Sequence, residues 1–183
     1  MATITNRILV YDNWYRFYRL ELTMDDGVTV ERHLLDNGSA VAVLPYDMDR
    51  RCVLLISQPR AAVIAVGHPP LLETIAGMLE STAPQDQVRQ EALEEAGVRL
   101  GTLEHITTVW SMPAVSTERV HLYLAPYTAS DRVSAGGGAD GEHERIETHE
   151  IGFDRLGDMV AKGELLDAHT LVLAQTLLMR LNR

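Results

Sequence analysis

The sequence predicts an α+β fold in which helices cover the faces of a mixed β-sheet. Two observations favour this class over a doubly wound sheet. Segments with the length and composition of strands outnumber the helical segments, which are confined to residues 83–96 and 154–181. Strand and helix therefore do not alternate regularly along the chain, as a doubly wound sheet requires.

The N-terminal segment is expected to form an antiparallel β-structure. Residues 14–23 alternate polar and apolar side chains with a period of two, which is typical of a strand. Asp25-Asp26-Gly27 is a hairpin turn signal, and residues 28–35 supply the returning strand.

Three further strands are predicted before the first helix. Residues 39–45 and 52–57 are apolar and rich in β-branched side chains, the composition of buried strands. Residues 70–76 form a shorter strand, which we expect to break at Gly77 because glycine is typical of turns.

A helix is predicted over residues 83–96. Thr82 is placed to cap its N-terminus, Pro84 fits its first turn, and Gln85 completes a capping box. Gly97 supplies the C-terminal stop.

The rest of the chain is expected to contain two strands, a flexible glycine-rich loop, an extended segment and two helices. In that order, these are residues 99–110, 118–126, 128–141, 144–153, 154–162 and 167–181.

Length and composition predict a cytoplasmic protein with a hydrophobic core. The chain has 183 residues, and its apolar runs fall short of the ~20 residues of a membrane helix. The N-terminus lacks the basic start and apolar run of a signal peptide. The single Cys52 cannot form an internal disulfide, so we expect a reducing cytoplasm. The short apolar runs and the net charge of −10 argue against a membrane partner.

The net charge of −10 disfavours nucleic acid as a partner, because affinity for phosphate chains comes mostly from Lys and Arg. An acidic protein with an anionic substrate needs a local source of positive charge. A metal ion held by carboxylates, helped by Arg60, could provide it.

Three carboxylates share one arc of the helix: Glu91, Glu94 and Glu95. Val88, Ala92 and Ala96 form an apolar stripe beside them. Like charges at i,i+4 cost a helix about 0.2–0.5 kcal/mol, so this arrangement favours a bound cation. Glu91 and Glu95 can reach the same ion or a pair of ions, and their hard oxygens favour Mg²⁺ or Mn²⁺. The alternative is an acidic helix face that simply meets solvent.

These residues belong to a longer pattern. Ala76-Gly77, Glu80, Arg89, Glu91, Glu94-Glu95 and Gly97 together resemble the Nudix box, the signature of the Nudix hydrolases. The resemblance extends to Gln58-Pro59-Arg60, to Leu72-Glu73, to Pro113, Glu118 and His121, and to Ala135–Gly138 with Glu142–Glu147. It is strongest for the nucleoside diphosphate sugar branch, with GDP-mannose pyrophosphatases first and ADP-ribose pyrophosphatases next.

The resemblance implies an α/β/α sandwich around a mixed sheet, with a Nudix domain over residues 41–183. It also implies a metal-dependent hydrolase that cleaves the pyrophosphate of a nucleoside diphosphate sugar to a nucleoside monophosphate and a sugar phosphate. Residues 1–40 would be an N-terminal β extension that builds a homodimer. Four aromatic side chains are candidates for that interface or for the protein's own core: Trp14, Tyr15, Phe17 and Tyr18.

Roles for single residues follow in part from this resemblance. It adds the carbonyl of Ala76 to the metal ligands Glu91 and Glu95, whereas Glu94 lies close enough to share or orient the ion. It also places a catalytic Glu in the late loop, either Glu142 or Glu144, with Glu144 preferred. The candidate substrate-binding residues are Arg60, Glu73, Glu118 and His169.

The sequence departs from the family pattern at several positions. Ala83 stands where the box usually has Glu, and Gln90 stands where Arg usually precedes the first helical Glu. Ala114-Val115 replaces a common Gly-Gly, and His169 replaces a Lys of the GDP-mannose branch. These changes motivate an alternative, a degenerate Nudix domain that binds nucleotide or metal without efficient hydrolysis.

Overall fold

The computed structural model describes residues 1–79, 83–138 and 144–181. The chain divides into two compact units. The first unit consists of Met1–Ala40 and Thr108–Val120, and the second consists of Val41–Thr107 and His121–Arg183. Each unit is described by itself below. None of the helices in the described part of the chain is long and apolar enough to cross a membrane.

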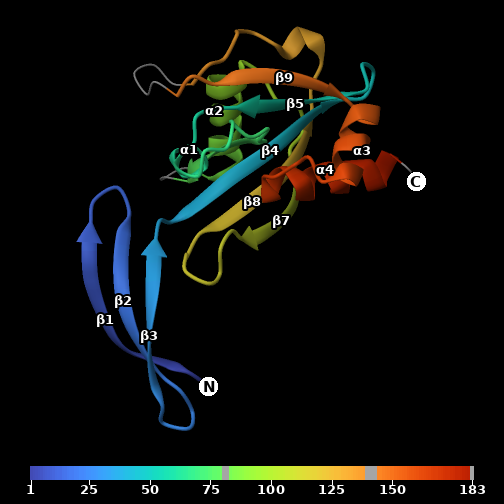
Figure 1. Ribbon diagram of the computed structural model, residues 1–183. Helices are drawn as coiled ribbons and strands as arrows, with labels where there is room; N and C mark the ends of the chain where they lie inside the picture. The colour runs from blue at the N-terminus through green and yellow to red at the C-terminus, as the bar shows by residue number, and fades with distance from the viewer. Residues whose placement is uncertain (80–82, 139–143, 182–183) are drawn as a thin grey trace. The chain divides into compact units, whose positions relative to one another are not determined.

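The first unit is built on a three-stranded antiparallel sheet (Figure 1). Its strands are β1 (Thr3–Asp12), β2 (Arg16–Thr23) and β3 (Thr29–Asp36). The turn between β2 and β3 lies at the expected Asp-Asp-Gly, where the amide of Val28 donates to Asp26 Oδ1 at 3.0 Å. A later part of the chain joins this sheet, because the amide of Leu35 donates to the carbonyl of Val115 at 2.7 Å.

The larger sheet has six strands. They are β4 (Ser39–Asp47), β5 (Cys52–Ser57), β6 (Ile75–Leu79), β7 (Glu104–Trp110), β8 (Arg119–Pro126) and β9 (Glu147–Gly152). The strand order is β7-β8-β4-β5-β9, and β6 pairs with β4. Both pairs β4–β5 and β5–β9 are antiparallel.

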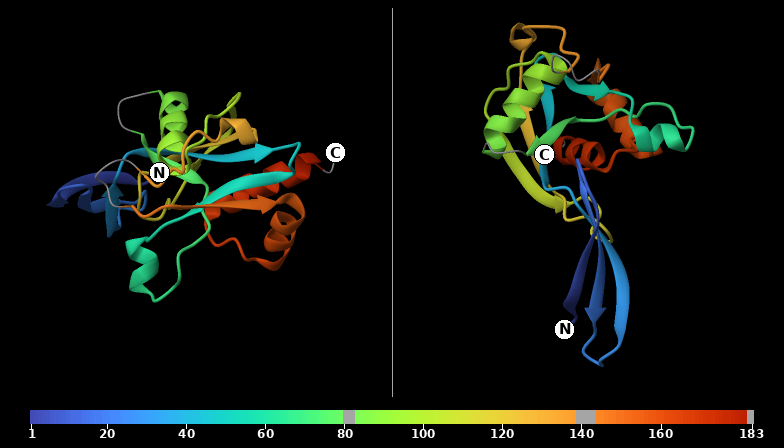
Figure 2. Two further views of the ribbon diagram at one scale, coloured as in Figure 1. Left: turned by 90° about the horizontal axis from the view of Figure 1, so that it is seen from above. Right: turned by 90° about the vertical axis from the view of Figure 1, so that its left-hand side faces the viewer.

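Helices cover both faces of this sheet, as the two views of Figure 2 show. Helix α2 (Pro84–Ala96) lies on one face, and α3 (Phe153–Lys162) and α4 (Ala168–Leu181) lie on the other. A short helix α1 (Ala61–Ala65) follows β5, and a 3-10 turn η1 (Ala129–Asp131) follows β8. The predicted α+β sandwich around a mixed sheet is confirmed.

The core beneath α2 explains why this helix packs where it does. Its buried members on β4, β5, β6 and α2 are Val41, Val43, Leu54, Ile56, Ile75, Val88, Ala92 and Ala96, and β8 adds Tyr123 and Ala125. The predicted apolar stripe of α2 is therefore its buried edge, and each of its three side chains is fully inaccessible to solvent. Burial of this stripe fixes which arc of the helix carries the carboxylates.

Three sequence predictions about the segment before α2 need correction. Strand β6 begins at Ile75 rather than at residue 70, and it runs through Gly77 instead of breaking there. The N-cap of α2 is Ala83, which makes no side-chain cap. The expected cap residue Thr82 lies outside the described residues.

The glycine-rich segment also differs from its prediction as a flexible loop. Part of it forms η1, and Arg132 pairs with Val98 in an isolated antiparallel bridge. Residues 137 and 138 are hydrogen-bonded to the end of α2, as described below. The sequence could not reveal these bonds, because their acceptors are backbone carbonyls.

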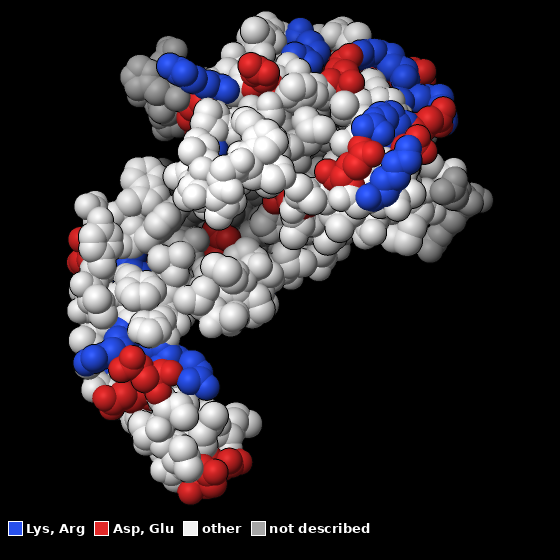
Figure 3. Space-filling view, in the orientation of Figure 1, with Lys and Arg blue, Asp and Glu red and all other residues white. Residues whose placement is uncertain are grey.

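Charged side chains of both signs are interspersed on the surface. In Figure 3, blue Lys and Arg side chains stand among red Asp and Glu side chains in both units. Asp36, for example, forms ion pairs with Arg7 and Arg16 at 3.2 Å each. Exposed pairs of this kind contribute about 0–1 kcal/mol each.

Candidate active site

Glu95 of α2 carries a buried carboxylate of the second unit. Only 3% of this residue is exposed. Its Oε2 accepts a hydrogen bond from the amide of Ala76 at 3.0 Å, and its Oε1 accepts one from Gln58 Nε2 at 3.4 Å. Helix α2, strand β6 and the end of β5 therefore meet at this carboxyl group.

The surroundings of Glu95 favour its neutral form. Burial raises the pKa of Glu95 to about 8, and the charges of Glu91 and Glu144 act in the same direction. The Ala76 amide and the charge of Arg60 lower this pKa but do not outweigh burial. A shift of this size in a cluster of carboxylates is typical of a functional site.

Glu91 lies against strand β6 at Gly77. A Cβ atom at position 77 would overlap the carboxyl group of Glu91, so the close approach of helix to strand requires a residue without a side chain. Gln87, one turn earlier on α2, donates from Nε2 to Glu91 Oε1 at 2.7 Å. Gly77 therefore serves this contact and not the turn that its residue type suggested.

Glu94 is half-buried on the same helix. Gln90 Nε2 donates to Glu94 Oε1 at 3.0 Å. Gln90 thus holds Glu94 through an uncharged donor, and it cannot form an ion pair.

Arg60 and Glu73 form a two-pronged ion pair. Arg60 Nη2 and Nε donate to Glu73 Oε2 at 2.8 and 3.0 Å. Burial lowers the pKa of Arg60, but the hydrogen bonds and charge of Glu73 outweigh burial and raise it. The charges of Glu95 and Glu144 also raise this pKa, so Arg60 lies within electrostatic range of both carboxylates.

Of the two candidate general bases, Glu144 and Glu142, the structure describes Glu144. Glu144 lies beside Gly138 and close enough to Glu95 and Arg60 to shift the pKa of each. Glu142 lies outside the described residues.

Two predicted substrate-binding residues have local partners. Glu118 belongs to the first unit, where its Oε1 accepts a hydrogen bond from Asn37 Nδ2 at 2.8 Å. His169 lies at the start of α4, with Nδ1 3.8 Å from Asp167 Oδ1. The hydroxyl of the next residue, Thr170, accepts a hydrogen bond from the amide of Thr74, directly after Glu73.

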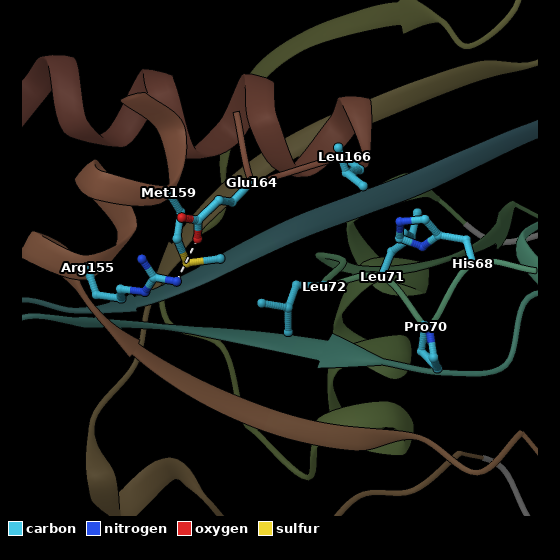
Figure 4. Close-up of a pocket in the computed structure, with 8 residues that line it drawn as sticks. All are labelled: His68, Pro70, Leu71, Leu72, Arg155, Met159, Glu164 and Leu166. Carbon is cyan, nitrogen blue, oxygen red and sulfur yellow. Dashed lines mark hydrogen bonds and ion pairs between the residues drawn. The ribbon is translucent and has the colours of Figure 1, made fainter. Parts of the chain in front are cut away.

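A separate pocket of about 260 Å³ opens between residues 68–72 and the α3–α4 region (Figure 4). Its lining combines apolar and charged groups: His68, Pro70, Leu71, Leu72, Arg155, Met159, Glu164 and Leu166. Arg155 and Glu164 form an ion pair at 2.6 Å along its wall. The carboxylates of α2 do not line this pocket.

The donors on α2 fit a hard divalent cation in their chemistry. Within residues 1–79, 83–138 and 144–181, no three His, Cys, Asp or Glu side chains form a ready-made metal site. The available donors are nevertheless carboxylate oxygens, which hard divalent cations prefer. The pKa of Glu95 is raised mainly by burial and further by the charges of Glu91 and Glu144, and a bound cation would offset those charges.

Sequence reasoning missed two residues that support these carboxylates. Gln58 donates a hydrogen bond to Glu95, and Gln87 donates one to Glu91. From the sequence, Gln58 was recognisable only as part of the Nudix resemblance, without a role of its own. Both glutamines are buried, at 4% and 7% exposure. The position of Gln87 four residues before Glu91 was a usable signal, because i,i+4 side chains meet on a helix.

The chain is similar in sequence to curated proteins along most of its length. No family model matches the chain. A GDP-mannose pyrophosphatase of Enterobacter sp. (strain 638) is 34% identical over 175 residues, which cover 92% of this chain and 91% of that protein. Another, of Cronobacter sakazakii, is 37% identical over 164 residues, which cover 87% of this chain and 85% of that protein.

The fold has a counterpart among solved structures. The crystal structure of an ADP compounds hydrolase superposes with a TM-score of 0.79 at 15% identity, covering 100% of this chain and 96% of that chain. A superposition at this low sequence identity shows a shared fold. Membership of a family is shown by the sequence relatives, which are 34% and 37% identical. The carboxylate-bearing helix, the Gly77 contact and these relatives together place the chain in the Nudix hydrolase family, as a Nudix pyrophosphohydrolase.

Proposed function

We propose that this enzyme hydrolyses the pyrophosphate bond of a nucleoside diphosphate sugar to a nucleoside monophosphate and a sugar phosphate, with Mg²⁺ or Mn²⁺ bound. GDP-mannose is the favoured substrate and ADP-ribose the next. The observation that carries the proposal is the convergence of Glu95, Glu91 and Glu144 beside Arg60 in one unit. The names of the sequence relatives support a nucleotide sugar as the substrate class.

The metal ligands in this proposal are Glu91, Glu95 and the backbone carbonyl of Ala76. When bound, a divalent cation would neutralise charge on the phosphate oxygens and lower the pKa of a water ligand. The hydrogen bonds from Gln58 and Gln87 hold the two carboxylates in their positions on the helix.

The remaining roles belong to Glu144, Glu94, Arg60 and Glu73. Glu144 accepts the proton of the attacking water at its carboxylate, as a general base. Glu94 orients the neighbouring ligands. Glu73 accepts hydrogen bonds from Nε and Nη2 of Arg60. We propose that Nη1 of Arg60 contacts a phosphate group of the substrate.

The proposal includes a homodimer in the cytoplasm. The buried, free Cys52 suits a reducing compartment. The poorly covered N-terminal sheet supports dimerisation, and its test is argued in the Discussion. The net charge of −10 supports a small-molecule substrate over nucleic acid.

A substrate panel tests the proposed activity. GDP-mannose, ADP-ribose and other nucleoside diphosphate sugars are incubated with and without Mg²⁺, and products are separated by chromatography. We expect nucleoside monophosphate and sugar phosphate only when Mg²⁺ is present, and we expect Glu95→Gln to lower kcat at least about 100-fold while the protein stays folded. Thermal stabilisation by a nucleotide sugar without turnover would instead support the degenerate binding domain.

A further inference from the structure

The glycines at 136–138, here called the glycine latch, attach the late loop to the C-terminal end of α2. The amide of Gly137 donates to the carbonyl of Glu95 at 3.0 Å, and the amide of Gly138 donates to the carbonyl of Glu94 at 3.1 Å. The last carbonyls of a helix lack partners within it. The latch therefore satisfies backbone acceptors of the same residues that carry candidate catalytic carboxylates.

The attachment continues on the N-terminal side of the latch. The amide of Val133 donates to the carbonyl of Gly97 at 2.8 Å, and the amide of Arg99 donates to the carbonyl of Asp131 at 2.9 Å. Residues 131–138 thus follow the end of α2 and the residues just after it. Movement of this segment away from the helix would break several backbone hydrogen bonds at once.

Two adjacent glycines of the latch differ in what surrounds them. Gly137 has φ of 120°, and a Cβ atom there would meet nothing within 4 Å. Gly138 has φ of 100°, but a Cβ atom there would lie 2.5 Å from Oε2 of Glu144 and 3.2 Å from its Cβ. Both positions disfavour an L side chain through φ, whereas only position 138 needs a bare backbone to admit Glu144.

We propose that Gly138 is a positioning residue: by carrying no side chain it lets the Glu144 carboxylate rest against a latch that is bonded to α2, and so fixes the general base relative to the carboxylates of that helix. This proposal rests on the proposed function, in which Glu144 is the base. The influence of Glu144 on the pKa of Glu95 and of Arg60 shows that its charge reaches the site from this position.

A double-mutant comparison tests the proposal. Gly138→Ala and the matched control Gly137→Ala are each made in the wild-type protein and in Glu144→Ala, and thermal unfolding and steady-state kinetics are measured for all of them. With Glu144 present, we expect Gly138→Ala to lower Tm by about 3 °C or more beyond Gly137→Ala. We also expect it to lower kcat about tenfold or more beyond that control, with KM within about twofold.

In the Glu144→Ala background most of both differences should disappear, because the carboxylate oxygen 2.5 Å from the new methyl is gone and only the Cβ atom at 3.2 Å remains. Equal effects of the two glycine substitutions with Glu144 present, or differences that persist undiminished without it, would overturn the proposal. Should Gly138→Ala fail to fold, Gly138→Asn replaces it with the same readouts, because Asn tolerates positive φ better than Ala. A wild-type enzyme inactive on nucleotide sugars would refute the proposed function, whereas the Tm comparison would still decide the contact.

Discussion

Burial and charge oppose each other at Glu95. The carboxyl group is buried and accepts hydrogen bonds from two uncharged donors, the amide of Ala76 and the side chain of Gln58. It is also close to the negative charges of Glu91 and Glu144. Its pKa of about 8 means that the metal-free protein keeps a proton that the unfolded chain releases near the ordinary value of 4.5. Ionisation of Glu95 therefore destabilises the metal-free fold, and a bound cation would offset that cost.

This conflict predicts how stability depends on pH. Between about pH 4.5 and 8 the unfolded chain binds fewer protons at Glu95 than the folded protein does, so the metal-free protein should lose stability as pH rises, by at most about 1.4 kcal/mol per pH unit. Above the folded pKa this loss should level off. The side chain of the Glu95→Gln variant cannot ionise. The free energy of unfolding of the variant, relative to that of the wild type, should therefore increase across the same pH range. Urea unfolding in EDTA from pH 5 to 9 measures both proteins, and parallel stability curves would contradict the prediction.

Gly77 allows a second prediction at the scale of single residues. Its replacement by Ala should push the Glu91 carboxyl group away from β6, because the added methyl would overlap it. We expect a loss of about 1–3 kcal/mol in unfolding free energy and a kcat reduced at least about tenfold. Gly157→Ala is the control, since a Cβ there meets nothing within 4 Å and Ala favours the helix α3. Similar effects of the two substitutions would show that residue 77 tolerates a side chain.

At the scale of elements, helix α4 is joined to the chain that leads into β6. The hydroxyl of Thr170 accepts a hydrogen bond from the Thr74 amide at 2.7 Å and donates one to Asp167 Oδ2 at 2.7 Å. Asp167 Oδ2 also accepts from the Thr170 amide at 2.8 Å, which caps the start of the helix. Because Thr74 follows Glu73, this junction also supports the partner of Arg60.

Removal of the Thr170 hydroxyl should therefore weaken the junction. Thr170 is fully buried, so Thr170→Val keeps its shape but leaves the Thr74 amide without its acceptor, at a cost of about 1–3 kcal/mol. Thr176→Val is the matched control, because the Thr176 hydroxyl donates only to the carbonyl of Val172 within the same helix, and we expect a change within about 0.5 kcal/mol. Denaturant unfolding measures both, and equal costs would mean that the hydroxyl of Thr170 has no special role.

The elements that the sequence predicts well are those whose signal is local. Strand β5 has the expected bounds, and α3 and α4 each begin within one residue of expectation, because apolar runs and glycine stops lie in the sequence itself. Helix α1 was missed because it has five residues and none of them is buried, so no apolar periodicity marks it.

The site was predictable only in its residue types. Spacing on one helix was enough to group Glu91 with Glu95, but the pairing of Arg60 with Glu73 joins residues thirteen positions apart that do not share a helix or strand. No periodic pattern encodes such a contact. Gly77 and Gly138 were assigned to a turn and a flexible loop because composition shows that glycine is permitted and not which neighbour requires it.

At the scale of the whole molecule, the N-terminal sheet has little core of its own. Among residues 1–40, only Leu20 is buried. Large apolar side chains of this segment are exposed instead, namely Met1, Ile4, Leu9, Val10, Tyr11, Trp14, Tyr15 and Val28. Strand β1 is also an edge strand of ten residues. A small sheet with exposed apolar faces and a long edge needs a covering partner to be stable.

A second copy of the chain is the partner that we propose, so the protein should have twice the mass of one chain by size-exclusion chromatography with light scattering at micromolar concentration. Val10→Lys, at a side chain 59% exposed, should shift the protein towards the monomer and lower its Tm, because a charge would replace apolar surface within the interface. Met179→Lys on α4 is the control, since Met179 is 61% exposed but lies outside the N-terminal sheet, and it should remain dimeric. A monomeric wild type would reject the dimer without affecting the hydrolase assignment, because the proposed ligands, base and phosphate-binding arginine all belong to the second unit.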